Sequence, residues 1–123
     1  MPELDLPWPP TANTYWRHVP WGKGVRSLIS RQGRQYRERV QGEALRQGGQ
    51  ARIQGAIRVE IHAYPPDRRR RDLDNLLKAA LDAMGHAGVY EDDSQITALS
   101  VTRERVEKPG RLRVVVTSME DGR

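Results

Sequence analysis

The chain of 123 residues contains no cysteine, which excludes disulfide bonds, thiolate nucleophiles and metal sites built on cysteine. Its three histidines, His18, His62 and His86, are too scattered for the H-x-x-x-H spacing of a zinc enzyme. No stretch approaches the roughly 18 apolar residues that a membrane-spanning helix requires, and the first residues lack the basic and then apolar order of a signal peptide. We therefore expect a soluble, cytoplasmic protein without a membrane partner.

Lysine is also scarce, with only Lys23, Lys78 and Lys108, so almost all of the positive charge comes from arginine. The chain has 21 Lys and Arg against 16 Asp and Glu, and its formal net charge is +5. A basic domain favours a polyanionic partner, most often nucleic acid. The alternative is a GC-rich genome that favours arginine codons, in which case the charges are simply solvated.

The length fits one α/β (α+β) domain over residues 1–123, large enough to bury a core without disulfides or structural zinc. Helical spacing of apolar residues predicts helices over 31–47, with Ser30 as N-cap, and over 75–87. Alternation of apolar and polar residues predicts strands at 4–8, 57–64, 95–105 and 112–116. This order predicts a mixed sheet of about four strands with two helices packed on it. We expect the tail, about 119–123, to be frayed.

Two segments near the N-terminus lack periodicity. Residues 11–18 are polar and aromatic, which favours a structured loop. Residues 19–29 mix glycine, proline and basic residues, which predicts a mobile surface loop. The cations Arg17, Lys23 and Arg26 could contact phosphate there while a tryptophan stacks on bases, although an ordinary loop with one tucked tryptophan fits equally well.

Four consecutive arginines, 68–71, run directly into Asp72 and Asp74. Arginine binds phosphate well because its planar fork donates to two oxygens at once. Carboxylates repel phosphate unless a cation bridges the two, which is a usual way of holding magnesium. Side chains two residues apart in an extended segment point the same way, so Asp72 and Asp74 should face one point where the second helix begins. Either aspartate could instead be only a helix cap.

A third carboxylate could reach this pair. A helix over 75–87 is about 20 Å long, and extended residues 88–93 cover about the same distance. A chain that turns back after the helix could therefore bring Asp93 near the start of that helix, with Asp92 as a further or outer ligand.

Such a cluster would form a hard-oxygen site for one or two Mg²⁺ or Mn²⁺ ions. The metal would lower the pKa of a bound water and polarise a phosphate. Lys78, one turn into the helix, could orient the water or neutralise the charge that builds up on the phosphate. Alternatively, Lys78 is a helix-surface lysine paired with Asp74 and Asp82.

Three segments carry a resemblance to a known family: 6–18, with Leu6-Pro7-Trp8-Pro9-Pro10, Asn13 and Tyr15-Trp16-Arg17-His18; 67–80, with the arginine run and Asp-Leu-Asp-Asn-Leu; and 89–93, Val-Tyr-Glu-Asp-Asp. On these segments the chain resembles RusA-type Holliday junction resolvases, which are small endonucleases of bacteria and their prophages. The similarity covers nearly the whole chain and departs at 19–29 and 106–110.

The resemblance implies a homodimer that binds a four-way DNA junction and cuts two strands symmetrically, using Mg²⁺ or Mn²⁺ and no nucleotide cofactor. The resemblance places the metal-binding aspartates at Asp72, Asp74 and Asp93, with Asp92 beside them. It places the active-site lysine at Lys78 and a DNA-binding arginine at Arg71. Arg69, Arg70 and Asn75 are further candidates for DNA contact, although the arginines before Arg71 could also be solvated charge.

Two alternatives stay open. The chain could be a non-catalytic, basic protein that binds junctions, a degenerate resolvase, but this should lack one of the acidic positions and none is missing. The same site could also act mainly on forks, flaps or RNA.

Overall fold

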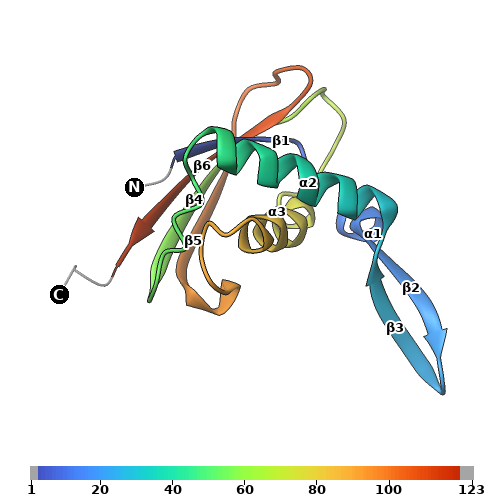
Figure 1. The fold of residues 1–123 in the computed structure, drawn as a ribbon. Helices are drawn as coiled ribbons and strands as arrows, with labels where there is room; N and C mark the ends of the chain where they lie inside the picture. Colours follow the sequence, from blue (N-terminus) through green and yellow to red (C-terminus); the bar gives the residue numbers. More distant parts are fainter. Residues whose placement is uncertain (1–2, 120–123) are drawn as a thin grey trace.

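The computed structural model describes residues 3–119. Four of its strands form a mixed sheet in the order β1-β6-β4-β5, and β2 pairs with β3 in a separate sheet. In chain order the elements are β1 (Glu3–Pro7), α1 (Ala12–Tyr15), β2 (Trp16–Trp21), β3 (Gly24–Ile29), α2 (Arg31–Arg46), β4 (Ile57–Tyr64), α3 (Asp74–His86), the 3₁₀ turn η1 (Asp93–Gln95), β5 (Ile96–Arg103) and β6 (Arg111–Ser118). In the mixed sheet β4 and β5 are parallel, and the pairs β1–β6 and β4–β6 are antiparallel. The predicted α+β class with a four-stranded mixed sheet is confirmed (Figure 1).

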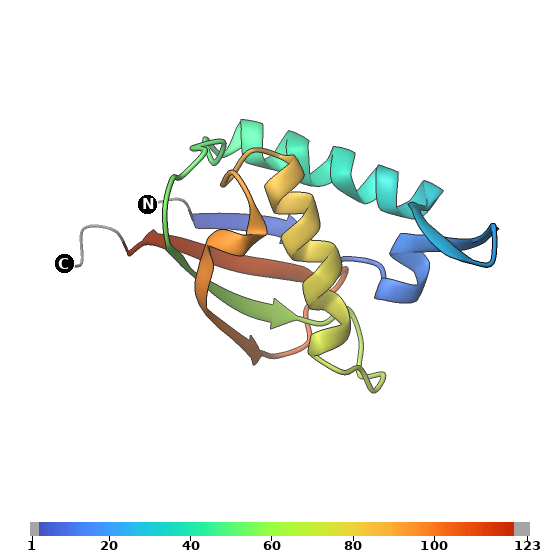
Figure 2. The same cartoon turned by 90° about the horizontal axis from the view of Figure 1, so that it is seen from below.

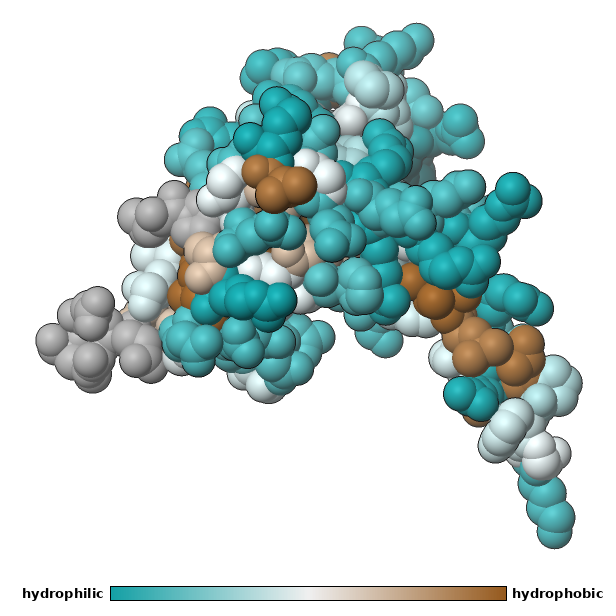
Figure 3. Space-filling model, in the orientation of Figure 1, coloured by the Kyte–Doolittle hydropathy of each residue, from teal (hydrophilic) through white to brown (hydrophobic). Residues whose placement is uncertain are grey.

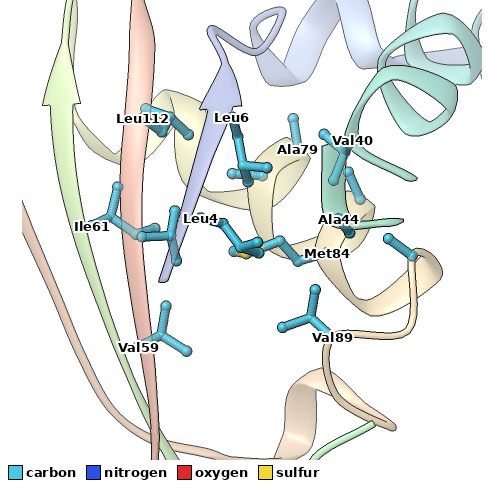
Figure 4. Close-up of a cluster of buried hydrophobic side chains, with 14 of the residues drawn as sticks. Leu4, Leu6, Val40, Ala44, Val59, Ile61, Ala79, Met84, Val89 and Leu112 are labelled. Carbon is cyan, nitrogen blue, oxygen red and sulfur yellow. The ribbon is translucent and has the colours of Figure 1, made fainter. Parts of the chain in front are cut away.

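The two long helices lie on the same side of the sheet (Figure 1), and one core fills the space between them. Along β4 the alternate residues Ile57, Val59, Ile61 and Ala63 are buried, as the predicted alternation requires. Figure 4 shows the core side chains that meet there, which include Leu4, Leu6, Ile61 and Leu112 from the sheet, Val40 and Ala44 from α2, and Ala79 and Met84 from α3. The small alanines let α3 approach α2 closely, and the buried face of α3 packs into the shared core.

Local signals explain where the long helices begin and end. The Ser30 hydroxyl oxygen accepts a hydrogen bond of 2.9 Å from the Gly33 backbone N–H, which confirms Ser30 as the N-cap of α2. The same hydroxyl donates to the carbonyl of Tyr15 at 2.8 Å and so ties the start of α2 to α1. After α3, Gly88 adopts a positive φ of 85°, a conformation that favours glycine and ends the helix.

The prediction that residues 19–29 form a surface loop is wrong. These residues belong to the antiparallel hairpin of β2 and β3, paired from Trp16 with Ile29 to Trp21 with Gly24. Gly22, the first residue of its two-residue turn, has a φ of +58°, as expected for a hairpin turn with glycine first. Figures 1 and 2 show this hairpin projecting from the body of the protein, and Figure 3 shows hydrophobic residues along it.

Two smaller expectations also need correction. Residues 11–18, expected as a structured loop, form the short helix α1 and the first part of β2. The expected fraying at 119 is not observed, because the backbone N–H of Met119 donates to the carbonyl of Ala56 at 2.9 Å; the rest of the predicted frayed tail, 120–123, lies outside the described residues. Across residues 3–119, the helices are all too short or too polar to cross a membrane.

The polar side of β4 carries His62 between two glutamates. Its Nδ1 lies 2.8 Å from Glu104 Oε2 and its Nε2 lies 3.3 Å from Glu60 Oε2. The hydrogen bond with Glu104 is the largest cause that raises the His62 pKa above its usual value of 6.5, and the contact with Glu60 adds to it. His62 is therefore half-buried and held by carboxylates, rather than a freely exposed histidine.

We expect the free energy of unfolding to depend on the His62 charge. Because the pKa is raised in the folded state, the stabilisation is complete below the usual pKa and is lost as the pH rises through the raised pKa. The loss should be on the order of 1 kcal/mol or less, since the pair is partly solvated. Urea unfolding of the wild type and of His62→Gln on both sides of this pH window tests the expectation. An equal pH dependence in the two proteins would contradict it.

Candidate active site

The segment between β4 and α3 is folded around Arg71. The Arg71 guanidinium lies 2.7 Å from Asp67 Oδ1 and donates to the backbone carbonyls of Asp67 and Arg69. Asp67 also accepts a hydrogen bond of 2.9 Å from the Arg69 backbone N–H. The bond from Arg71 is the largest cause that lowers the pKa of Asp67 to about 2. Arg103 donates to the Arg71 carbonyl at 2.7 Å and fixes the segment to the end of β5. The predicted DNA-binding arginine is thus held in one position before any ligand arrives.

A hollow of about 530 Å³ opens beside this segment, and we call it the Trp8 hollow. It is lined by Trp8, Pro9, Pro10, Thr11, Arg70, Arg71, Asp72, Asn75 and Leu76. The Arg71 guanidinium carbon lies 5.8 Å from the centre of the Trp8 ring, within the range of a cation–π contact. One predicted metal ligand, Asp72, and three predicted DNA contacts therefore share one cavity.

A second hollow of about 410 Å³ lies between α3 and the base of the hairpin, and we call it the Lys78 hollow. It is lined by Trp16, His18, Ser27, Leu77, Lys78, Leu81, Asp82 and Asp93. The chain does turn back after α3, but Asp93 lies beside residues 77–82 of the helix, whereas Asp72 lines the other hollow at its start. Asp72 and Asp93 thus lie in separate cavities, and Asp74 lines neither of them.

Asp82 is already engaged. It accepts a hydrogen bond of 2.5 Å from the Tyr15 hydroxyl and bonds of 3.0 and 2.8 Å from the Arg37 guanidinium. Burial, followed by the hydrogen bond to Asp82, raises the pKa of the Tyr15 hydroxyl. Within residues 3–119 no ion pair involves Lys78, so its predicted alternative role as the partner of Asp74 and Asp82 is not observed.

Three of the four predicted metal ligands have carboxylates that find no partner within residues 3–119. Most acidic side chains in the described part of the chain accept a hydrogen bond or form an ion pair. Four do neither, namely Glu38, Asp72, Asp74 and Asp93, and all four are exposed. Three of them are the aspartates predicted to bind metal. Their oxygens are available to a cation, and the hard-oxygen chemistry is the kind that Mg²⁺ prefers.

A complete metal cluster is not formed, however. Among residues 3–119, no group of three or more His, Asp or Glu side chains is close enough to hold a metal ion. The donor types therefore fit a magnesium site, while the three carboxylates are not gathered in the isolated chain.

Asp92 has a local structural role that the sequence prediction missed. Its carboxylate accepts a hydrogen bond of 3.1 Å from the Ser94 N–H and another from the Ser94 hydroxyl, which lower the Asp92 pKa. The Gln95 side chain accepts bonds of 2.7 Å from the N–H groups of Glu91 and Asp92. Together these bonds form a capping box for η1. The Asp-x-x-Gln spacing could have revealed this, since it is the sequence signature of a helix start.

The hairpin carries the remaining predicted DNA contacts. Alternation along β2 and β3 places Arg17, Trp21 and Arg26 on one face. Trp21 is 63% exposed, so it is not tucked away, and the Arg26 guanidinium carbon lies 4.7 Å from the centre of its ring. Lys23 is in the turn and is exposed. This face combines an accessible aromatic ring with cations, which is suited to single-stranded nucleic acid.

Comparisons with known proteins agree with this chemistry. The sequence model of the family described as "Endodeoxyribonuclease RusA" matches residues 7–117. A protein of Enterobacteria phage 82 named crossover junction endodeoxyribonuclease rusA is 41% identical over 120 residues, covering 94% of this chain and 93% of the relative. The protein of the same name from Escherichia coli (strain K12) is 41% identical over 119 residues, with the same coverage. That from Enterobacteria phage HK97 is 40% identical over 118 residues, covering 96% and 95%.

Proposed function

Because the chain belongs to the endodeoxyribonuclease RusA family, we propose that it is a metal-dependent endonuclease that cuts four-way DNA junctions, acting in recombination and repair. One observation carries the proposal: relatives named crossover junction endodeoxyribonuclease share 40–42% identity over nearly the whole chain. The structure supports the proposal, since exposed arginines stand next to Asp72 and Asp74, which have no partner among residues 3–119. Four-way junctions of bacterial DNA arise in the cytoplasm, where we propose that the protein acts.

We propose that Asp72, Asp74 and Asp93 hold the cation, Mg²⁺ or Mn²⁺. When bound, this cation would lower the pKa of a water molecule and polarise the phosphate to be cut. Asp92 is a weaker candidate for the same role, because its carboxylate already caps η1.

The chain's own cations would position the DNA backbone. Arg71 is held by Asp67 and by the Trp8 ring, so little side-chain freedom is lost when it binds a phosphate oxygen. Arg70 is exposed at the rim of the same hollow and can bind the next phosphate. Lys78 lies in the hollow that also contains Asp93, and its ammonium can offset negative charge that develops on the phosphate in the transition state.

We further propose that the active form is a homodimer. Two equivalent sites related by a two-fold axis would meet two equivalent strands of a four-way junction, which makes paired symmetric cuts possible. The isolated chain does not gather three carboxylates within residues 3–119, and the hairpin exposes Trp21, Val25 and Leu28. A lone two-stranded hairpin is only marginally stable in water, so further packing against a partner would favour it.

The proposed function is tested by incubating the purified protein with a labelled four-way junction, a linear duplex of matched sequence and a fork. Each substrate is assayed with Mg²⁺, with Mn²⁺ and with EDTA. Paired symmetric nicks in the junction, dependent on the metal and absent from the duplex, are expected. Preferential cutting of the fork would redirect the assignment to other branched DNA, and binding without cleavage under every condition would show a non-catalytic junction binder. Light scattering of the same preparation reports whether the protein is a dimer.

Arg71→Ala should weaken junction binding and reduce its salt dependence. Each phosphate contact releases a counterion, so losing one contact should lower the slope of log K against log salt by about 0.9. Binding is measured by fluorescence anisotropy at several salt concentrations in EDTA. The matched control is Arg58→Ala, which removes an exposed arginine from β4 on the side of the sheet away from the core. A slope equal to that of the wild type would show that Arg71 does not touch the backbone.

A further inference from the structure

The Trp8 hollow has two walls of different chemistry. One wall is apolar and comes from the segment after β1, where Trp8 and Pro10 are half-buried and Pro9 is buried. The other wall, from the start of α3 and the residues before it, carries Arg70, Asp72 and Asn75 among others. The volume of the Trp8 hollow, about 530 Å³, lies within the range of sites that enclose a small organic group. The hollow is therefore suited to a group with a flat apolar face and a polar edge.

The apolar wall is rigid. The Tyr36 hydroxyl donates to the Pro7 carbonyl at 2.7 Å and attaches the segment to α2. Pro9 and Pro10 restrict their own φ angles, and the Arg71 guanidinium covers part of the Trp8 ring. A rigid aromatic wall favours stacking, because little conformational entropy is lost when a ring binds against it.

The polar wall can form hydrogen bonds with the edge of a nucleobase and bind the phosphate attached to it. Asn75 is exposed, and its side-chain amide makes no hydrogen bond within residues 3–119, so both a donor and an acceptor are available. An amide of this kind can pair with two atoms on the edge of a base. Arg70 is also exposed and offers a cation to the phosphate attached to that base. Trp8, Pro9 and Pro10 carry no charge that could hold a phosphate, so the base is the group that contacts the apolar wall.

Branched DNA can supply such a base. A paired base is inaccessible inside a duplex, whereas unstacking costs less where pairing is already interrupted. Asp72 belongs both to this hollow and to the proposed metal site, so a base in the hollow would belong to a nucleotide next to the bond that is cut.

We propose that the Trp8 hollow binds one unpaired nucleobase of the strand being cut, stacked against Trp8, and that Asn75 selects which base is accepted. The proposal rests on the proposed function, because it assigns the hollow to the same DNA substrate. Trp8 and Asn75 then act as specificity-determining residues, distinct from the aspartates that hold metal.

The first experiment measures selection. Four-way junctions that differ only in the base next to the cut are assayed with the wild type, Asn75→Ala and the control Gln41→Ala, which changes an exposed amide of α2 away from both hollows. We expect the wild type to prefer one base and Asn75→Ala to reduce the ratio of best to worst cleavage rate by about tenfold, the value of one bidentate base contact. Gln41→Ala should keep the wild-type ratio. Equal cutting of all four junctions by the wild type, or an unchanged ratio in Asn75→Ala, would overturn the proposal.

The second experiment measures stacking without cleavage. A junction carrying 2-aminopurine next to the cut is titrated in EDTA with the wild type, Trp8→Leu and Trp8→Phe. We expect a fluorescence change with the wild type, its loss and about tenfold weaker junction binding with Trp8→Leu, and recovery with Trp8→Phe, since stacking of one base is worth about this factor. An unchanged signal in Trp8→Leu would contradict the proposal. If the wild type fails to cut any junction, the proposed function is wrong. If it cuts all four junctions without base selection, only the assignment of the Trp8 hollow to a nucleobase is wrong.

Discussion

Replacing Asp74 with asparagine is expected to reduce junction cleavage by about a thousandfold while junction binding stays nearly unchanged. A cation that polarises the phosphate and activates water supplies several kcal/mol to the transition state, and each 1.36 kcal/mol is about a factor of ten in rate. The asparagine would keep the shape of the original side chain but lose the charge that holds the cation. Asp74 is exposed and has no partner in the described structure, so the fold should not suffer.

Glu38→Gln provides the matched control for this variant. Glu38 is likewise an exposed carboxylate that has no partner within residues 3–119, and it lies on α2 outside both hollows. The control removes the same charge as Asp74→Asn does. Because Glu38 lies outside both hollows, Glu38→Gln should cleave and bind junctions as the wild type does. Cleavage rates are compared at saturating protein, with binding measured in EDTA. Near-normal cleavage by Asp74→Asn would remove Asp74 from the proposed metal site.

A second large effect is expected from Asp82→Ala, this time on stability. The change leaves the Arg37 guanidinium and the hydroxyl of the fully buried Tyr15 without their common acceptor. Removing one partner of a buried polar contact costs about 1–3 kcal/mol; the contacts of Asp82 are only partly buried, but two donors are affected. We expect the free energy of unfolding to fall by about 2–3 kcal/mol, measured by urea denaturation.

Asp82→Asn is the companion variant, since it keeps an oxygen acceptor and should lose less stability. A double-mutant cycle with Arg37→Ala should show that the two residues are coupled, because distant and independent residues give additive effects. Cleavage by Asp82→Asn, assayed where the protein is folded, should stay close to that of the wild type. Full stability combined with lost cleavage would instead place Asp82 among the residues that act on the DNA.

Periodicity predicted the core elements well. The long helices and the strands of the mixed sheet were found within a few residues of their observed ends, because helical and alternating patterns are local and reflect which face is buried. The β2–β3 hairpin escaped prediction since Pro20 and the glycines around Lys23 interrupt its alternation. Its strands are defined by pairing across the turn, and that pairing leaves no clear periodic signal in either strand.

Distances along the chain were a weaker guide to the site. The length of the segment after α3 set only an upper limit on where Asp93 could lie, and packing of η1 placed it beside Lys78 and Asp82 rather than near Asp72. Asp92 looked like a ligand because its residue type fits one, whereas its carboxylate caps η1. In both cases the side-chain partners are chosen by the folded chain.

By itself the sequence determined what is adjacent along the chain: the run of arginines leading into Asp72 and Asp74, the basic net charge and the amphipathic elements that build an α+β domain. The tertiary structure alone decided which side chains are free. The segment after β1 lies beside Arg71 and Asn75 through Trp8. Packing of α1 and α2 against α3 places Tyr15 and Arg37 within hydrogen-bonding distance of Asp82. The physical reason is that a charge is neutralised by whichever partner lies within a few ångströms, and for residues distant in sequence that distance exists only after folding.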